Sequence, residues 1–151
     1  MSDCNLKTLE HSPRYIPGEF DCSDNKNLSL KGAPDKVDGI FACENCNLTS
    51  LEFAPPHTGT FLCGGNKIKN LSMIHKRIKS INGEFGAYNN KKLESNLLGL
   101  LLIDGITRIS LDNIYIAAIM NKYLGRPNKK IAMLTCQQEL IDAGFEEAAQ
   151  F

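Results

Sequence analysis

Four phenylalanines recur along the first part of the chain at intervals of 21, 20 and 24 residues: Phe20, Phe41, Phe61 and Phe85. Each has a glycine two positions before it and a small residue two positions after it: Cys22, Cys43, Cys63 and Ala87. Residues two apart in a strand point to the same side, so this alternation predicts short strands that share one core. A repeat of this length indicates a solenoid, because each coil buries its apolar face only against its neighbours.

A polar column follows three residues after each small residue: Asn25, Cys46, Asn66 and Asn90. Cys4 extends this column backwards at the same spacing. An asparagine stacked at the end of each strand is able to bond the backbone of its own and neighbouring coils. We therefore interpret the column as a structural ladder, with Cys46 replacing one asparagine.

Helical signals replace the repeat beyond Asn90. Asp112 is a candidate N-cap for a helix over 113–124, which Gly125 and Pro127 end, and a second helix is expected over 129–143. A short buried helix over 97–103 and a possible last strand over 106–111 precede them. The coil over 66–89 is longer than the others and is expected to carry a helical turn in its return path.

These patterns predict an α/β repeat fold, a short solenoid of about four coils over residues 1–92. Solenoids need their open ends covered, so residues 93–151 are interpreted as a helical C-terminal cap packed with the solenoid as one structural unit.

The repeats resemble leucine-rich repeats, in particular the short cysteine-containing units found in bacteriophage proteins. The resemblance is carried by residues 25–43 (NKNLSLKGAPDKVDGIFAC) and 46–63 (CNLTSLEFAPPHTGTFLC), and more weakly by 4–22. The segments LLGLLLIDGI (97–106) and CQQELIDAGFEEA (136–148) resemble the C-terminal parts that follow such repeats in phage-type proteins. This resemblance implies a fold and a viral source, and it implies no chemistry.

The outward positions of the predicted strands form a second set of columns. If phenylalanine and cysteine point inward, the residues between and beside them face outward, with Ile40, Ala42 and Leu62 as a small apolar centre. Acidic, polar and aromatic residues surround this centre: Glu19, Asp21, Glu44, Thr60, Glu84 and Tyr88. An apolar centre with a polar rim and an aromatic anchor is typical of a protein interface. An ordinary sheet face, or one covered by the cap, is the alternative.

Charge is balanced overall, with 17 basic and 17 acidic side chains, but it is unevenly distributed. Residues 1–65 have 5 basic and 9 acidic side chains, residues 66–92 have 7 and 1, and residues 93–151 have 5 and 7, so the net charges are −4, +6 and −2. The middle segment is a basic band: Lys67, Lys69, Lys76, Arg77, Lys79, Lys91 and Lys92. The band is a solvated ridge, a contact for an acidic protein, or a contact for nucleic acid, where clustered cations follow phosphates.

No pattern in the sequence points to catalysis, a cofactor or a metal. Cys43 and Cys46 have the spacing of a zinc or redox pair, but each also belongs to a structural column and no second pair completes a four-ligand site. His11, His57 and His75 fall in return loops without a partner motif.

The start of the chain lacks the features of a secretory signal, and its longest apolar run is far shorter than the about 20 residues that cross a bilayer. We expect no membrane insertion, a cytoplasmic location and six reduced cysteines.

The sequence therefore predicts a non-enzymatic protein-protein interaction module, a phage product that binds and modulates a protein in the host cytoplasm. The phage and host parts rest on the resemblance. Two alternatives remain open: a nucleic-acid-associated protein that uses the basic band, and a structural component of a virion or homo-oligomer.

Overall fold

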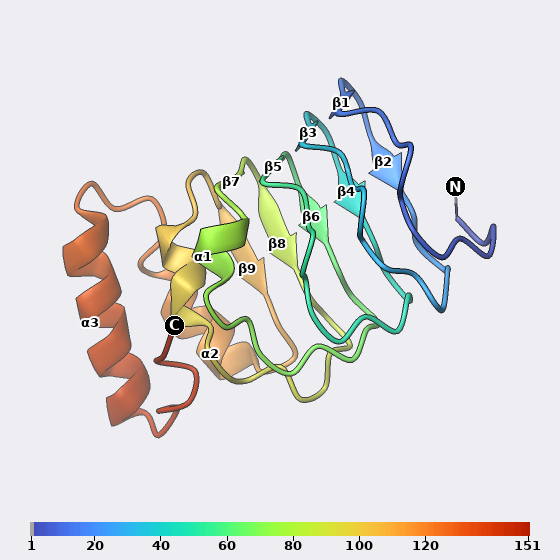
Figure 1. The fold of residues 1–151 in the computed structure, drawn as a ribbon. Coiled ribbons are helices and arrows are strands. Elements are labelled where there is room, and N and C mark those ends of the chain that lie inside the picture. The colour runs from blue at the N-terminus through green and yellow to red at the C-terminus, as the bar shows by residue number, and fades with distance from the viewer. Residues whose placement is uncertain (1) are drawn as a thin grey trace.

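The computed structural model describes residues 2–151 as a parallel-strand solenoid of about five turns with a few helices (Figure 1). Its strands form two parallel sheets. The four-stranded sheet has the order β1-β3-β5-β7, and its strands are Tyr15–Ile16, Lys36–Val37, His57–Thr58 and Ser80–Ile81. The five-stranded sheet has the order β2-β4-β6-β8-β9, and its strands are Phe20–Asp21, Phe41–Ala42, Phe61–Leu62, Glu84–Gly86 and Arg108–Ser110.

The strand β9 accounts for the difference from the about four coils that the sequence predicted. It lies within the possible strand over 106–111 and pairs with β8 in a register that sets Ile109 beside Phe85. Ile109 is 1% exposed, so it occupies the core position of the phenylalanines without being one. The count from the sequence was low because the Gly-x-Phe-x-(Cys/Ala) frame ends at Ala87.

The core contains the phenylalanine and cysteine columns, as the alternation predicted. Phe41, Phe61 and Phe85 have no exposed surface, and Phe20 at the N-terminal end is 7% exposed. Neighbouring ring centroids are 5.3 to 5.8 Å apart, within the range of favourable aromatic pairs. The thiol column is also fully buried: Cys22, Cys43 and Cys63. The stack of rings and thiols therefore ties each coil to the next.

The asparagine ladder is confirmed by its hydrogen bonds. Asn66 Oδ1 accepts from the backbone N–H groups of Cys46 and Leu48 in the preceding coil, at 2.9 and 3.0 Å. Its Nδ2 donates to the carbonyls of Cys43 and Cys63, at 3.0 and 2.9 Å. One carboxamide thus satisfies buried backbone groups of two coils, which explains why these turns are able to lie in the interior.

The helices follow the predicted segments closely. The return path of the fourth coil contains α1 (Ile74–Arg77), and the 3-10 helix η1 (Leu98–Leu102) forms the short buried helix. The cap contains α2 (Ile114–Asn121) and α3 (Lys129–Asp142), and Figure 1 shows α3 as the outermost element. Within residues 2–151, no helix has the length and apolar character needed to cross a bilayer.

The N-cap predicted for α2 was off by one residue. Asn113 is the N-cap, and its side-chain oxygen accepts from the N–H groups of Tyr115 and Ile116. The carboxylate of Asp112 instead accepts from the Asn89 N–H of the preceding coil, at 2.8 Å. Both residue types cap helices well, so this tertiary contact decides which of the two performs that role.

The last strand edge is closed by a side chain of the cap. Asn121, the final residue of α2, accepts from the Ile109 N–H at 2.7 Å and donates to the Ile109 carbonyl at 2.9 Å. These are the two groups that a further strand would pair with. Asn121 therefore blocks continuation of the sheet at this end.

Candidate binding surfaces

The outward residues of the five-stranded sheet lie side by side, because the strands pair in register. Asp21 is paired with Ala42, Ala42 with Leu62, and Leu62 with Gly86. Glu19, Asp21 and Tyr88 are exposed, whereas the other predicted face residues apart from Ala42 are half-buried: Ile40, Glu44, Thr60, Leu62 and Glu84. Ala42 is 7% exposed, so it forms the floor of the face and offers little surface of its own.

Two side chains lean across the sheet onto glycines of the next strand. A Cβ placed on Gly86 would lie 2.8 Å from Leu62 Cδ2, and one on Gly64 would lie 2.9 Å from Glu44 Oε2. The glycines therefore leave room for these neighbours. Leu62, at the centre of the face, therefore packs closely against Gly86 of β8.

The face carries more charged side chains than the first four coils alone indicate. The β9 coil adds Arg108 and Asp112 to the outward columns, and Arg108 Nε lies 4.0 Å from Glu84 Oε2. Within residues 2–151, Glu19, Asp21, Glu44 and Asp112 take part in no ion pair within 4.0 Å. The β9 contribution could have been found from the 24-residue spacing between Phe85 and Ile109, which equals that between Phe61 and Phe85.

The cap leaves the sheet face open over most of its length. Helix α2 packs against β9, at the C-terminal end of the sheet. Tyr88, near this end of the sheet, is 47% exposed, and Glu19 and Asp21 are exposed at the opposite end. A partner is thus able to reach the acidic residues, Leu62 and the aromatic ring together.

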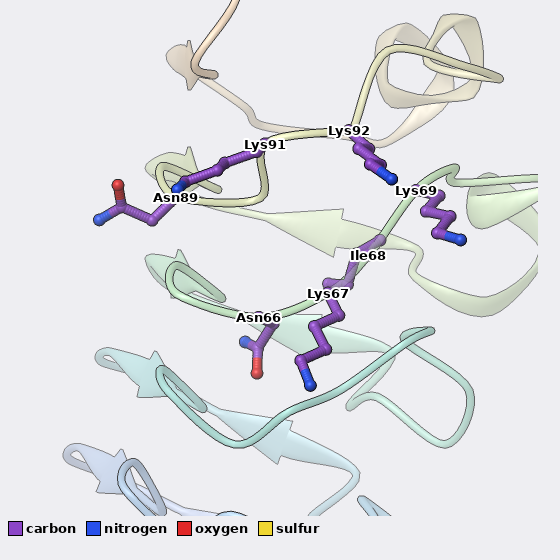
Figure 2. Close-up of a pocket in the computed structure, with 7 residues that line it drawn as sticks. All are labelled: Asn66, Lys67, Ile68, Lys69, Asn89, Lys91 and Lys92. Carbon is purple, nitrogen blue, oxygen red and sulfur yellow. The ribbon is translucent and has the colours of Figure 1, made fainter.

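A groove of about 330 Å³ lies on a different side of the solenoid, between two adjacent coils (Figure 2). Lys67, Ile68 and Lys69 line it from one coil, and Asn89, Lys91 and Lys92 line it from the next. Asn66 of the ladder also lines the groove. Ile68 is 1% exposed and points into the core, so the lysines on either side of it point outward. Four of the seven basic-band residues therefore gather at this groove.

The other three basic-band residues lie on the return path. Lys76 and Arg77 belong to α1, and Lys79 follows it. Arg77 Nε donates to the Ala54 carbonyl at 2.7 Å, and Lys79 Nζ lies 3.5 Å from the His75 carbonyl. The band predicted as one feature is thus two groups of cations, because residues 66–92 wrap more than a full coil.

Five of the six cysteines are buried packing residues: Cys22, Cys43, Cys46, Cys63 and Cys136. Burial raises the pKa of Cys22 to about 12 and raises the pKa of Cys43 well above its usual range. Cys46 Sγ donates to the carbonyls of Cys22 and Glu44, at 3.3 and 3.2 Å. In the part of the chain from residue 2 onward, no group of three or more His, Cys, Asp or Glu residues has the arrangement to hold a metal ion.

One histidine contacts a serine, in the four-stranded sheet. His57 Nδ1 lies 2.8 Å from Ser80 Oγ across two adjacent strands. A catalytic serine-histidine pair needs a third group that orients the imidazole. The nearby carboxylate of Asp38 instead accepts from the Tyr15 hydroxyl and pairs with Lys36 at 3.8 Å. The contact therefore acts as a cross-strand hydrogen bond.

Comparisons with protein-family models, with curated proteins and with solved structures find no match to this chain.

Proposed function

We propose that this chain is a non-enzymatic protein-binding module, a leucine-rich-repeat-like solenoid that binds a basic surface of its partner with the outer face of the five-stranded sheet. The observation that carries the proposal is the half-buried pair Ile40 and Leu62, set among carboxylates. Three of these carboxylates have no ion pair within 4.0 Å among residues 2–151: Glu19, Asp21 and Glu44. An apolar centre supplies binding free energy, and the acidic rim selects a partner of opposite charge. The resemblance to phage repeats supports a host protein in the host cytoplasm as that partner.

Affinity purification from host lysate, followed by binding measurements with the purified partner, tests this proposal. The double variant Ile40→Glu/Leu62→Glu is expected to weaken binding about thirtyfold or more, because it places charge at the anchor of the interface. Raising the salt concentration is expected to slow association, since the acidic rim steers a basic partner.

The matched control is Ile131→Glu/Leu134→Glu on α3, whose side chains are 61% and 49% exposed. It introduces the same two charges on the cap and is expected to leave the affinity unchanged. Circular dichroism confirms that both variants are folded. A folded sheet-face variant that keeps full affinity for every recovered protein would refute the proposal.

A further inference from the structure

The groove between the coil over 66–89 and the coil that follows it is lined by four lysines, and no ion pair among residues 2–151 neutralises them. The ion pairs within 4.0 Å among residues 2–151 involve other basic residues. Nor does the ammonium group of any groove lysine donate a hydrogen bond to another described residue: Lys67, Lys69, Lys91 and Lys92. Each ammonium therefore keeps three donors available for an anion.

Two of the four lysines, Lys67 and Lys91, occupy equivalent positions in the repeat, and Lys69 and Lys92 lie close to them in sequence. Lys67 and Lys91 each follow an asparagine of the ladder, so the stacking of the coils sets them on neighbouring turns. Figure 2 shows Lys92 extending from its coil toward the coil of Lys67 and Lys69. Neighbouring coils are about 5 Å apart, so flexible lysine side chains from both are able to reach one ligand.

The cluster is limited to these two coils. In the preceding coil the equivalent position is Asn47, whose Nδ2 donates to the Lys26 carbonyl at 3.1 Å. Toward the cap, Glu94 follows in the same coil, and Asp112 is bonded to Asn89 at the edge of the groove. Positive charge thus ends on both sides after about 10 Å, which suits a compact anion better than a long polyanionic chain.

We propose that this groove binds a small oligophosphate, a diphosphate or triphosphate group, through Lys67, Lys69, Lys91 and Lys92. A triphosphate concentrates about four negative charges in a few ångströms, which matches in number the four flexible lysines that line a groove of about 330 Å³. Lysine is a point charge without the fixed fork of arginine, so the site selects charge density rather than one phosphate geometry. This inference goes beyond the proposed function, because it uses another side of the molecule.

Isothermal titration calorimetry with tripolyphosphate, pyrophosphate and orthophosphate tests the proposal. Affinity is expected to fall in that order, with tripolyphosphate about tenfold or more tighter than orthophosphate. It is also expected to fall steeply between low and high salt, because the contacts are exposed charges. Equal affinity for all three anions would overturn the proposal.

A pair of variants distinguishes binding at the groove from attraction by the net charge of the protein. Lys67→Gln/Lys91→Gln is expected to weaken tripolyphosphate binding about four- to twenty-five-fold, at two- to fivefold for each exposed charge contact. Lys76→Gln/Lys79→Gln removes the same charge from the return path and is expected to change the affinity less than about twofold. Equal losses in both variants would show that only overall charge attracts the anion and would refute a site at the groove.

Two further ligands identify the source of the phosphate group. ATP binding as tightly as tripolyphosphate supports a nucleotide triphosphate as the ligand, whereas tripolyphosphate alone supports a free oligophosphate. A single-stranded oligonucleotide that binds more tightly than both would overturn the proposal in favour of nucleic acid. The variant Ile40→Glu/Leu62→Glu is expected to bind tripolyphosphate normally, so failure of the sheet-face proposal and failure of this one are distinguishable.

Discussion

The interior coils and the last coil each contribute a strand to the five-stranded sheet, but they pack it and satisfy its hydrogen bonds by different means. In an interior coil, the ring of Phe41 packs between two other rings and the ladder residue Asn66 bonds the coil before it. In the last coil, Ile109 replaces the ring, and Asn121 of α2 bonds the edge that no further strand covers. The comparison shows that the repeated phenylalanines and asparagines are kept only in coils that are followed by another coil. At the end of the stack, side chains from a helix perform the same task.

The largest effect is expected from Phe41→Ala, which removes a fully buried ring with two ring neighbours. We expect the free energy of unfolding to fall by about 3–5 kcal/mol, measured by urea denaturation. The control is Phe20→Ala at the N-terminal end, where the ring has a single ring neighbour among the described residues. An equal loss in both variants would contradict the view that stacking on both sides stabilises the interior coils.

A smaller effect is expected from the ladder and its counterpart in the cap. Asn66→Ala leaves buried backbone N–H groups of Cys46 and Leu48 without their acceptor, which costs about 2–4 kcal/mol. Asn121→Ala affects the single residue Ile109 at the sheet edge and costs about 1–2 kcal/mol. Hydrogen exchange is expected to accelerate at the Ile109 amide in the second variant only. Faster exchange throughout the sheet would show that the edge is coupled to the interior coils.

The smallest effect is expected from Cys46→Asn, which restores the ladder in the coil where a thiol interrupts it. Sulfur is a weaker acceptor than a carboxamide oxygen, and Asn25 and Asn66 show that the ladder accommodates an amide in neighbouring coils. We expect a gain in the free energy of unfolding of about 0.5–1.5 kcal/mol, measured by thermal denaturation. A loss would mean that Cys46 is selected by packing and not merely tolerated.

The sequence predicts the part of the fold that repeats. Phe41 and Asn66 are identified because each recurs with fixed neighbours, and the stacking of coils makes the repeated position and the core position the same. A possible last strand was predicted over 106–111, and β9 lies within that range. It was not counted as a further coil of the repeat because Ile109 keeps the apolar character of the column without its ring. The N-cap of α2 was misplaced because the contact between Asp112 and Asn89 joins two coils and has no local signal.

The surfaces are only partly accessible to sequence reasoning. Ala42 belongs to the predicted sheet face, yet it is buried among larger neighbours. The alternation pattern predicts which way a side chain points, but not whether larger side chains on adjacent strands cover it. The basic band is continuous in sequence but divides in space, because its 27 residues exceed one turn of the solenoid. Lys67 and Lys91 become neighbours only because the chain returns to the same position after one turn of the solenoid. Their proximity follows from the length of the repeat and not from local composition.

The buried thiol column makes it possible to measure where the solenoid unfolds first. Cys22, Cys43 and Cys63 belong to successive coils, are fully buried, and have pKa values raised by that burial. An alkylating reagent therefore reaches each sulfur only after the surrounding turn has come apart. The order in which mass spectrometry detects the three modified cysteines would report, turn by turn, where the stack first separates.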